Sequence, residues 1–187
     1  FKSFNNGFEQ ELKLFVDPAA PVKFIELKLT NHTQENRRIT ATYFAEWVLG
    51  PNRDKSKNFI IPGFDNESGA LIARNSYSTE FSRHTAFLTS DKPVHGLTTD
   101  RQEFLGMPGS RSHPAGLMRI GLSGTVKSCV DPCAALQSHL NFAPGEEQIL
   151  TFVMGQGDTQ DNALELAQRY SRRDEIEQSW KETIEKW

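Results

Sequence analysis

The chain has 187 residues, 24% of them charged, and a net charge of −3. This balance excludes the basic surface that a nucleic-acid-binding domain presents. The length suits one domain with a sizeable core, and no run approaches the roughly 18 consecutive apolar residues of a membrane-spanning helix. No signal peptide is apparent. Because the chain opens at Phe1 and not at a methionine, we expect it to be a piece of a longer protein.

The first part of the chain is predicted to form strands, because apolar residues alternate with polar ones. In chain order these strands cover residues 8–16, 22–31, 38–50, 70–77, 80–89 and 94–100. Ile25, Leu27 and Leu29 form one core face, and Trp47 alternates inward. β-Branched and aromatic residues, which half-buried sheets favour, dominate the third segment. A loop is predicted over residues 51–69.

The segment Asp100–Ala115 is rich in glycine, proline, serine and arginine and has no period. A loop this long inside a compact domain is usually functional or disordered. Three more strands are predicted after it, at residues 116–124, 134–142 and 148–156. Pro144–Gly145 supplies a turn between the last two.

The hydrophobic period changes at residue 158, which predicts two helices at the end of the chain. The first is capped by Asp158 or Thr159, and its apolar stripe consists of Ala163, Leu166, Ala167 and Tyr170. In the second helix Asp174 and Glu177 resemble a capping box. The apolar stripe of the second helix consists of Ile176, Trp180, Ile184 and Trp187.

About nine strands followed by two helices predict a mainly β fold, an antiparallel sandwich with a C-terminal helical appendix. We therefore divide the chain into a β-sandwich domain, residues 1–157, and a helical linker, residues 158–187.

The sequence contains no motif that clearly indicates a catalytic site. The segment 121–125 lacks the spacing of a hydrolase nucleophile motif, and the five histidines are scattered. Cys129 and Cys133 are separated by three residues, so we expect two reduced, buried thiols, since a disulfide across so short a loop would be strained. The carboxylate pairs Asp100–Glu103 and Asp65–Glu67 are more often solvated loop acids than a catalytic pair. We predict no catalytic residue, no metal and no cofactor.

A sugar-contacting role is more plausible for the loop between Asp100 and Arg111. Sugar hydroxyls are recognised by charge-assisted, bidentate partners with an aromatic face nearby. Asp100, Arg101 and Arg111 supply the charges, and Phe104 supplies the ring. The alternative is that Arg101 only ties the loop through a salt bridge to Asp100 or Glu103.

Five motifs occur in a fixed order along the chain: YFAEWVLG, ARNSYSTEF, TTDRQEFLG, DPCAALQ and FAPGEEQILTFVMGQG. Together they resemble the glycoside hydrolase family 94 part of bacterial cyclic β-1,2-glucan synthases, the NdvB-like proteins. That group is related to the cellobiose and chitobiose phosphorylases, formerly glycosyltransferase family 36. The resemblance covers nearly the whole chain.

The resemblance implies a galactose mutarotase-like β-super-sandwich, a helical linker and an (α/α)6 barrel that carries the catalytic aspartate. This chain is similar to the later part of the sandwich and the linker, so we expect a non-catalytic domain that supports the barrel. In the implied parent, a membrane-bound glycosyltransferase builds β-1,2-glucan from UDP-glucose at the cytoplasmic side of the bacterial inner membrane. The phosphorylase-like region sets the length of the glucan. The chain itself is expected to be soluble and inactive.

Asp100, Arg101 and Phe104 match the family segment that reaches toward the acceptor side of the active site, in some members near a partner subunit. The family often has an arginine where Met107 stands, and Arg111 could substitute for it. The motif DPCAALQ is interpreted as structural, since proline fixes φ and donates no hydrogen bond, so Asp131–Pro132 ends a connection before a buried strand.

The implied partners are a β-glucan or oligosaccharide, the catalytic barrel of the same parent and a second copy of the chain. A surface left uncovered without the barrel would promote such self-association. The alternative function is an independent carbohydrate-binding module. A module would be a monomer with an exposed aromatic platform, which the sequence does not indicate, because Trp47 alternates inward and the other tryptophans lie on a helix.

Overall fold

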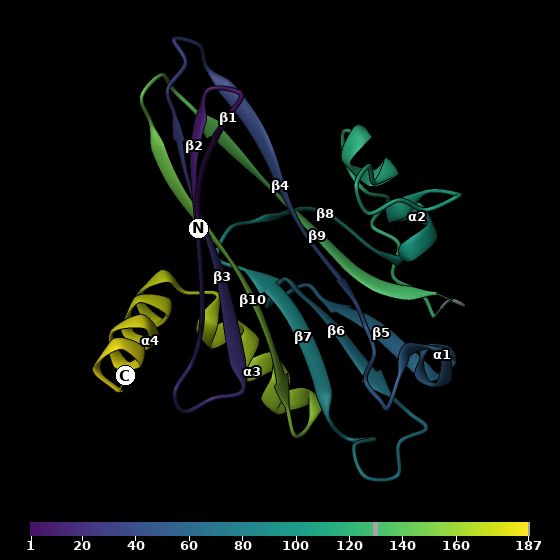
Figure 1. Ribbon diagram of the computed structural model, residues 1–187. Coiled ribbons are helices and arrows are strands. Elements are labelled where there is room, and N and C mark those ends of the chain that lie inside the picture. Colours follow the sequence, from purple (N-terminus) through teal and green to yellow (C-terminus); the bar gives the residue numbers. More distant parts are fainter. Residues whose placement is uncertain (129–130, 187) are drawn as a thin grey trace.

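The computed structural model describes residues 1–128 and 131–186. Within them the chain forms two antiparallel sheets and two long helices (Figure 1). The strands are β1 (Lys2–Asn5), β2 (Phe8–Val16), β3 (Val22–Asn31), β4 (Arg37–Glu46), β5 (Ile60–Asp65), β6 (Ala70–Asn75), β7 (Thr85–Ser90), β8 (Val94–Asp100), β9 (Pro132–Phe142) and β10 (Glu147–Gly157). The helices are α1 (Arg53–Ser56), α2 (Arg101–Leu105), α3 (Gln160–Tyr170) and α4 (Arg173–Lys186), with 3-10 turns η1 (Lys57–Phe59) and η2 (Ala115–Met118).

The larger sheet has seven strands in the order β1-β2-β3-β10-β7-β6-β5, and the smaller sheet has the order β4-β9-β8. Their facing sides enclose the main core, which takes Ile25 and Leu29 from the larger sheet and Leu136 and Leu140 from the smaller. Leu27 packs against this core as well, so the predicted core face of β3 is confirmed. The mainly β, antiparallel sandwich is likewise confirmed.

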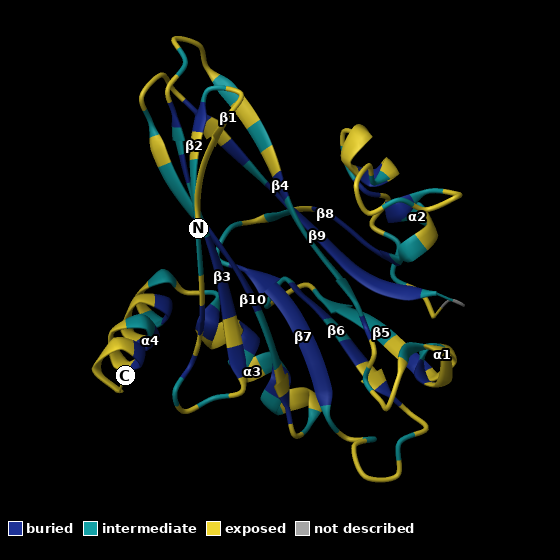
Figure 2. Cartoon of the chain, viewed as in Figure 1, coloured by how far each residue is buried: buried dark blue, intermediate teal, exposed yellow. Residues whose placement is uncertain are grey.

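The outer face of the larger sheet carries a second core beneath α3 and α4, and the buried positions of β3 therefore lie on both of its faces (Figure 2). Phe24 stacks on Phe15 at 4.6 Å between ring centroids, and Tyr170 of α3 meets Phe24 edge-on at 5.3 Å. The four residues of the stripe predicted for α3 all pack in this second core. Thr159 is the residue that caps α3, through the backbone N–H of Asn162 at 3.2 Å.

Helix α4 follows its predicted stripe only in part. Ile176 is buried and Trp180 packs on the second core, whereas Ile184 is exposed and Trp187 lies outside the described residues. The capping box was wrong, because α4 begins at Arg173 and places Asp174 inside its first turn. The helix buries Ser179 and Thr183 instead of Ile184, since Thr183 donates a 3.0 Å hydrogen bond to the carbonyl of Val16.

Three further sequence predictions are corrected by the structure. Residues 51–69 are not all loop, since β5 forms there as an edge strand, where the missing N–H of Pro62 is tolerated. Residues 80–84 precede β7 and are not strand. The strand predicted at 116–124 is absent, because Met118 and Ile120 are 88% and 92% exposed and no sheet face covers them.

The strands end at Gly157 and α3 begins at Gln160, close to the predicted change of period. None of the helices in the described part of the chain combines the length and the apolar character that crossing a membrane requires.

Candidate functional site

The predicted loop after β8 starts with a short helix, α2. The residue before this helix caps its N-terminus. Asp100 ends β8, and its carboxylate accepts hydrogen bonds from the backbone N–H groups of Gln102 at 2.9 Å and Glu103 at 3.4 Å. These are orphan donors of the first helical turn, which an aspartate at this position satisfies. Lys127 also pairs with Asp100 at 3.2 Å. Asp100 therefore has a structural role in orienting α2.

Arg101 joins α2 to the smaller sheet through two carboxylates that are distant in the sequence. Its Nε donates to Glu46 at the end of β4, and one terminal nitrogen lies 3.1 Å from Asp131, just before β9. Arg53 of α1 pairs with the same Asp131 and donates to the carbonyl of Pro132 at 3.2 Å. Instead of the expected salt bridge to Asp100 or Glu103, Arg101 therefore pairs with two acids that lie 55 and 30 residues away in the sequence.

Phe104 lies in a third small core. Its side chain is 3% exposed and stacks on Phe44 of β4, with 4.6 Å between centroids and 17° between ring planes. Gly116 closes over the ring, because a Cβ at that position would approach Phe104 to 2.7 Å. The ring supports α2 from beneath, and its faces are covered by protein.

Arg111 lies on the surface and pairs with Glu46, the same carboxylate that binds Arg101. Its side chain is 72% exposed, and its guanidinium pairs with Glu46. A groove of about 400 Å³ runs between β4 and α2 beside this pair. The groove is lined by Thr42, Phe44, Glu46, Phe104, Leu105, Arg111, Pro114 and Leu117. Of the four predicted residues, Arg101 and Arg111 thus converge on Glu46, Phe104 forms the floor, and Asp100 orients the helix.

The two carboxylates of the network are held in their ionised form. Burial acts to raise the pKa of Glu46, but the hydrogen bond and charge of Arg101, with the charges of Arg111 and Arg53, hold it below its usual value. The pKa of Asp131 is lowered in the same way, against burial, chiefly by Arg53. A general acid must hold a proton near neutral pH. The lowered pKa values therefore make neither carboxylate suited to donating a proton near neutral pH.

Glu103 and Asp65, the other candidate acids, are both engaged by neighbours. Glu103 accepts from Thr98 Oγ1 at 2.6 Å and from the backbone N–H and hydroxyl of Ser123 at 2.8 and 2.7 Å. Asp65 accepts from the backbone N–H and hydroxyl of Ser68 at 2.7 and 2.6 Å. Each carboxylate fixes a turn of the chain, so neither offers a free acid.

The motif DPCAALQ has the structural role that the sequence indicated. Asp131 receives Arg53 and Arg101, and β9 begins at Pro132 and runs buried from Cys133 to Gln137. The predicted role of Cys129 lies outside the described residues. Among the described residues no group of histidine, cysteine and acidic side chains could hold a metal ion.

Sequence reasoning missed the central residue, Glu46. The one signal was an acid on β4 next to the inward Trp47, because an acid at the end of a half-buried strand needs a cationic partner. Nothing in the sequence identified Arg101 and Arg111 as those partners.

Comparison with known proteins places these features in context. The family model described as "Glycosyl hydrolase 94, supersandwich domain" matches residues 1–173. The cyclic β-(1,2)-glucan synthase NdvB of Rhizobium meliloti (strain 1021) is 32% identical over 86% of this chain and 6% of its own length. The solabiose phosphorylase of Paenibacillus borealis is 25% identical over 87% of this chain and 22% of its own.

A solved polysaccharide lyase superposes with a TM-score of 0.55 at 12% identity, covering 91% of this chain and 23% of the lyase. At this identity the likeness concerns the fold alone. The chain thus spans less than a quarter of the length of each of these proteins.

Proposed function

The chain belongs to the family of glycosyl hydrolase 94 supersandwich domains, and from this premise we propose that it is the non-catalytic β-sandwich domain of a glucan-processing protein. In this proposal the domain supports a catalytic barrel and presents the α2 segment, residues 100–120, to a β-glucan. The parent resembles a cyclic β-1,2-glucan synthase working at the cytoplasmic side of the inner membrane of a bacterium. Of the two relatives named above, the one with the higher identity is named as a cyclic β-(1,2)-glucan synthase.

The observation that carries the proposal is how the α2 segment is built. Its base is fixed by the ion pairs of Arg101 with Glu46 and Asp131, and by the stacking of Phe104 on Phe44. Its outer part leaves large apolar side chains open to solvent: Met107, Leu117, Met118 and Ile120. A segment with a rigid base and exposed apolar side chains at its outer part is expected to pack against another domain or another chain.

The charges of the segment support contact with sugar. Arg111 is mostly exposed and stands at the rim of the groove, where Glu46 holds its guanidinium and its remaining N–H groups face solvent as donors for hydroxyl groups. Charge-assisted hydrogen bonds of this kind recognise polar ligands strongly and directionally. The lowered pKa of Glu46 keeps the carboxylate that holds Arg111 ionised below the pH at which a free glutamate takes up a proton. These features support binding, and the proposal assigns no catalytic step to the chain.

A calorimetric titration tests this assignment. Linear β-1,2-gluco-oligosaccharides are titrated into the chain, with cellobiose as the comparison sugar, and the titration is repeated on Arg111→Ala and Arg101→Ala. Arg38→Ala, an exposed arginine at the far end of β4, is the matched control. We expect saturable heat that both loop variants weaken by roughly tenfold or more and that the control preserves.

Heat that is unchanged in both loop variants would contradict the sugar contact at the α2 segment. The absence of heat at millimolar sugar would restrict the domain to a scaffold. The alternative function, an independent carbohydrate-binding module, is favoured by one observation, a group of exposed aromatic side chains distant from α2.

A further inference from the structure

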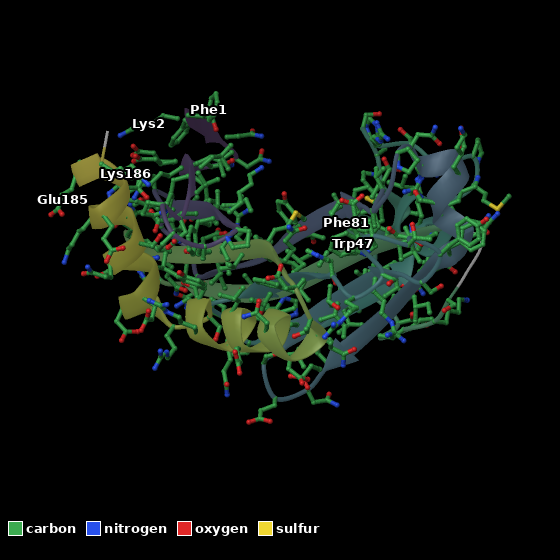
Figure 3. The ribbon with its side chains drawn as sticks, turned by 90° about the horizontal axis from the view of Figure 1, so that it is seen from below. Phe1, Lys2, Trp47, Phe81, Glu185 and Lys186 are labelled. Atoms are coloured by element: carbon green, nitrogen blue, oxygen red, sulfur yellow. The ribbon has the colours of Figure 1, made fainter. Side chains whose placement is uncertain are left out.

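Those exposed aromatic rings line one cleft, which we call the aromatic cleft. It lies between the α1–η1 turn and the loop that joins β6 to β7, and it has a volume of about 880 Å³. Its rings are Phe59, Tyr77 and Phe81, which are 38%, 72% and 54% exposed, with His84 beside them. Figure 3 labels Phe81. Single exposed apolar residues are ordinary, whereas several rings gathered on one concave surface indicate a binding function.

The rings are held in defined positions. Phe59 and Tyr77 stack with 4.4 Å between centroids and 19° between planes, and Phe81 meets His84 edge-on at 5.3 Å. The loop beneath is tied by hydrogen bonds from the backbone N–H of Tyr77 to Asn75 at 2.9 Å and from that of Phe81 to Ser78 at 2.9 Å. A surface that is ordered before binding loses less conformational entropy when a ligand arrives.

Polar side chains stand between and around the rings. Lys55, Glu80 and Gln156 are exposed along the cleft, and His84 contributes an imidazole that lies 3.7 Å from Asp158. Aromatic faces combined with a few convergent polar groups are typical of small-molecule sites, and the volume falls in the usual range of such sites. A pyranose ring offers the matching surface, since its C–H face is apolar and its edge carries hydroxyl groups.

We propose that the aromatic cleft is a second carbohydrate-binding site, which holds a short gluco-oligosaccharide through stacking on Tyr77 and Phe81. The choice of glucose as the sugar rests on the proposed function. A protein partner is less well matched to this surface, because Lys55 and Glu80 place charge along it, whereas Met107, Met118 and Ile120, which are between 81% and 92% exposed, lie in the α2 segment. The site is separate from α2, as Figure 1 shows the β6–β7 loop and α2 in different parts of the molecule.

The test uses the 187-residue chain and linear β-1,2-gluco-oligosaccharides in calorimetric titrations of Tyr77→Ala, Phe81→Ala and Tyr77→Phe. Phe4→Ala removes a ring on β1 whose exposure, 66%, lies between those of Tyr77 and Phe81, and it is the control. We expect Tyr77→Ala and Phe81→Ala to weaken roughly tenfold the component of binding that Arg111→Ala leaves in place, and Tyr77→Phe to keep that component within about twofold of the parent chain because the ring face is retained. Equal unfolding midpoints in urea exclude a folding defect.

The α2 variants separate this proposal from the proposed function. Binding that Tyr77→Ala weakens and Arg111→Ala leaves in place supports the aromatic cleft even where the α2 contact fails. Binding lost only in Arg111→Ala overturns the cleft proposal and keeps the α2 contact. Absence of saturable heat, or an effect of Tyr77→Ala on self-association alone in sedimentation, also overturns it and makes the cleft a protein-docking surface or an unoccupied one.

Discussion

At the scale of single residues, Glu46 is the carboxylate that joins β4 to both arginines of the α2 segment. One carboxylate with a 17% exposed side chain receives both Arg101 and Arg111. Glu46→Gln removes the charge and leaves guanidinium groups facing one another. We expect the free energy of unfolding to fall by about 1–3 kcal/mol, measured by urea denaturation. Glu165→Gln, on the exposed side of α3, should change it by less than about 0.5 kcal/mol, and an equal effect of both variants would contradict the role of Glu46.

The same network predicts how stability depends on acid. The pKa values of Glu46 and Asp131 are lowered in the folded chain, so the folded state binds fewer protons than the unfolded state as the pH falls. Their contribution to stability is present above the unfolded pKa of about 4 and is lost as the pH falls through the lower folded values. Asp131→Asn should flatten the dependence of the unfolding free energy on pH below about 4. Urea titrations across that range would show an unchanged slope if the residue had no such role.

The buried hydroxyl of Tyr170 predicts how the stability of the chain depends on alkaline pH. Its hydroxyl donates to Asp17 at 2.9 Å, and burial together with this carboxylate raises its pKa to about 12. A pKa raised on folding stabilises the chain fully below the unfolded value of about 10, and the stabilisation is lost as the pH rises through the folded value. We expect one phenol to ionise only near the unfolding transition in alkaline ultraviolet titration. Tyr170→Phe should abolish that late step, and its persistence would contradict the assignment.

At the scale of elements, the alternating pattern predicted the strands whose faces are buried, and it failed where burial comes from somewhere else. Residues 116–124 alternate as a strand would, yet no partner strand lies beside most of them. Strand β5 was missed because Pro62 and Gly63 mark turns, although an edge position accepts both. Helix α2 has five residues, too few to show a period.

In the candidate site, the sequence identified residues by their chemical type but could not identify the distant partners that the fold brings to them. Arg101 and Arg111 were chosen from the sequence by their chemical type, and both lie at the site. Their partner Glu46 is 55 residues from Arg101, and the two come together only because β4 and β8 both pair with β9 in the smaller sheet. The aromatic cleft was missed because Phe59 comes from η1 and Tyr77 and Phe81 come from the β6–β7 loop, and only the tryptophans were considered as a platform.

Helix α4 is joined to the sandwich by Arg173, which gives a prediction at this scale. Arg173 lies 2.8 Å from Glu26 and 3.8 Å from Asp91, and both carboxylates are nearly buried, at 7% and 4% exposure. Lys13 is the other cation on Glu26, at 2.6 Å. Removing Arg173 leaves buried negative charge with less compensation, so Arg173→Ala should lower the unfolding free energy by about 2–4 kcal/mol.

Arg172→Ala is the matched control, because the side chain of this neighbouring arginine is 61% exposed, pairs with Glu175 at 3.0 Å and donates to the carbonyl of Arg169 at 3.5 Å. We expect a change below about 1 kcal/mol for this surface pair. Urea denaturation of both variants measures the two changes in unfolding free energy. Equal losses would mean that the pairing of Arg173 with the sheet contributes no more than a surface ion pair.

At the scale of the whole molecule, the domain is covered unevenly. The larger sheet is covered on one face by the smaller sheet and on the other by α3 and α4, as the buried residues in Figure 2 show. The α2 segment has no such cover at its outer part, where Met107, Met118 and Ile120 are between 81% and 92% exposed. This asymmetry predicts association through residues 107–120 when no other body is present.

We therefore expect the chain to form dimers or larger species as its concentration rises, because exposed apolar surface is removed from water on contact. The double variant Met118→Lys, Ile120→Lys should shift sedimentation toward the monomer without changing the unfolding free energy, since both side chains are already exposed in the folded chain. Ile61→Lys, which places the same charge on the exposed side of edge strand β5, is the control. If the chain is a monomer at all concentrations, or if only Ile61→Lys disperses it, the outer part of the α2 segment is not the contact surface.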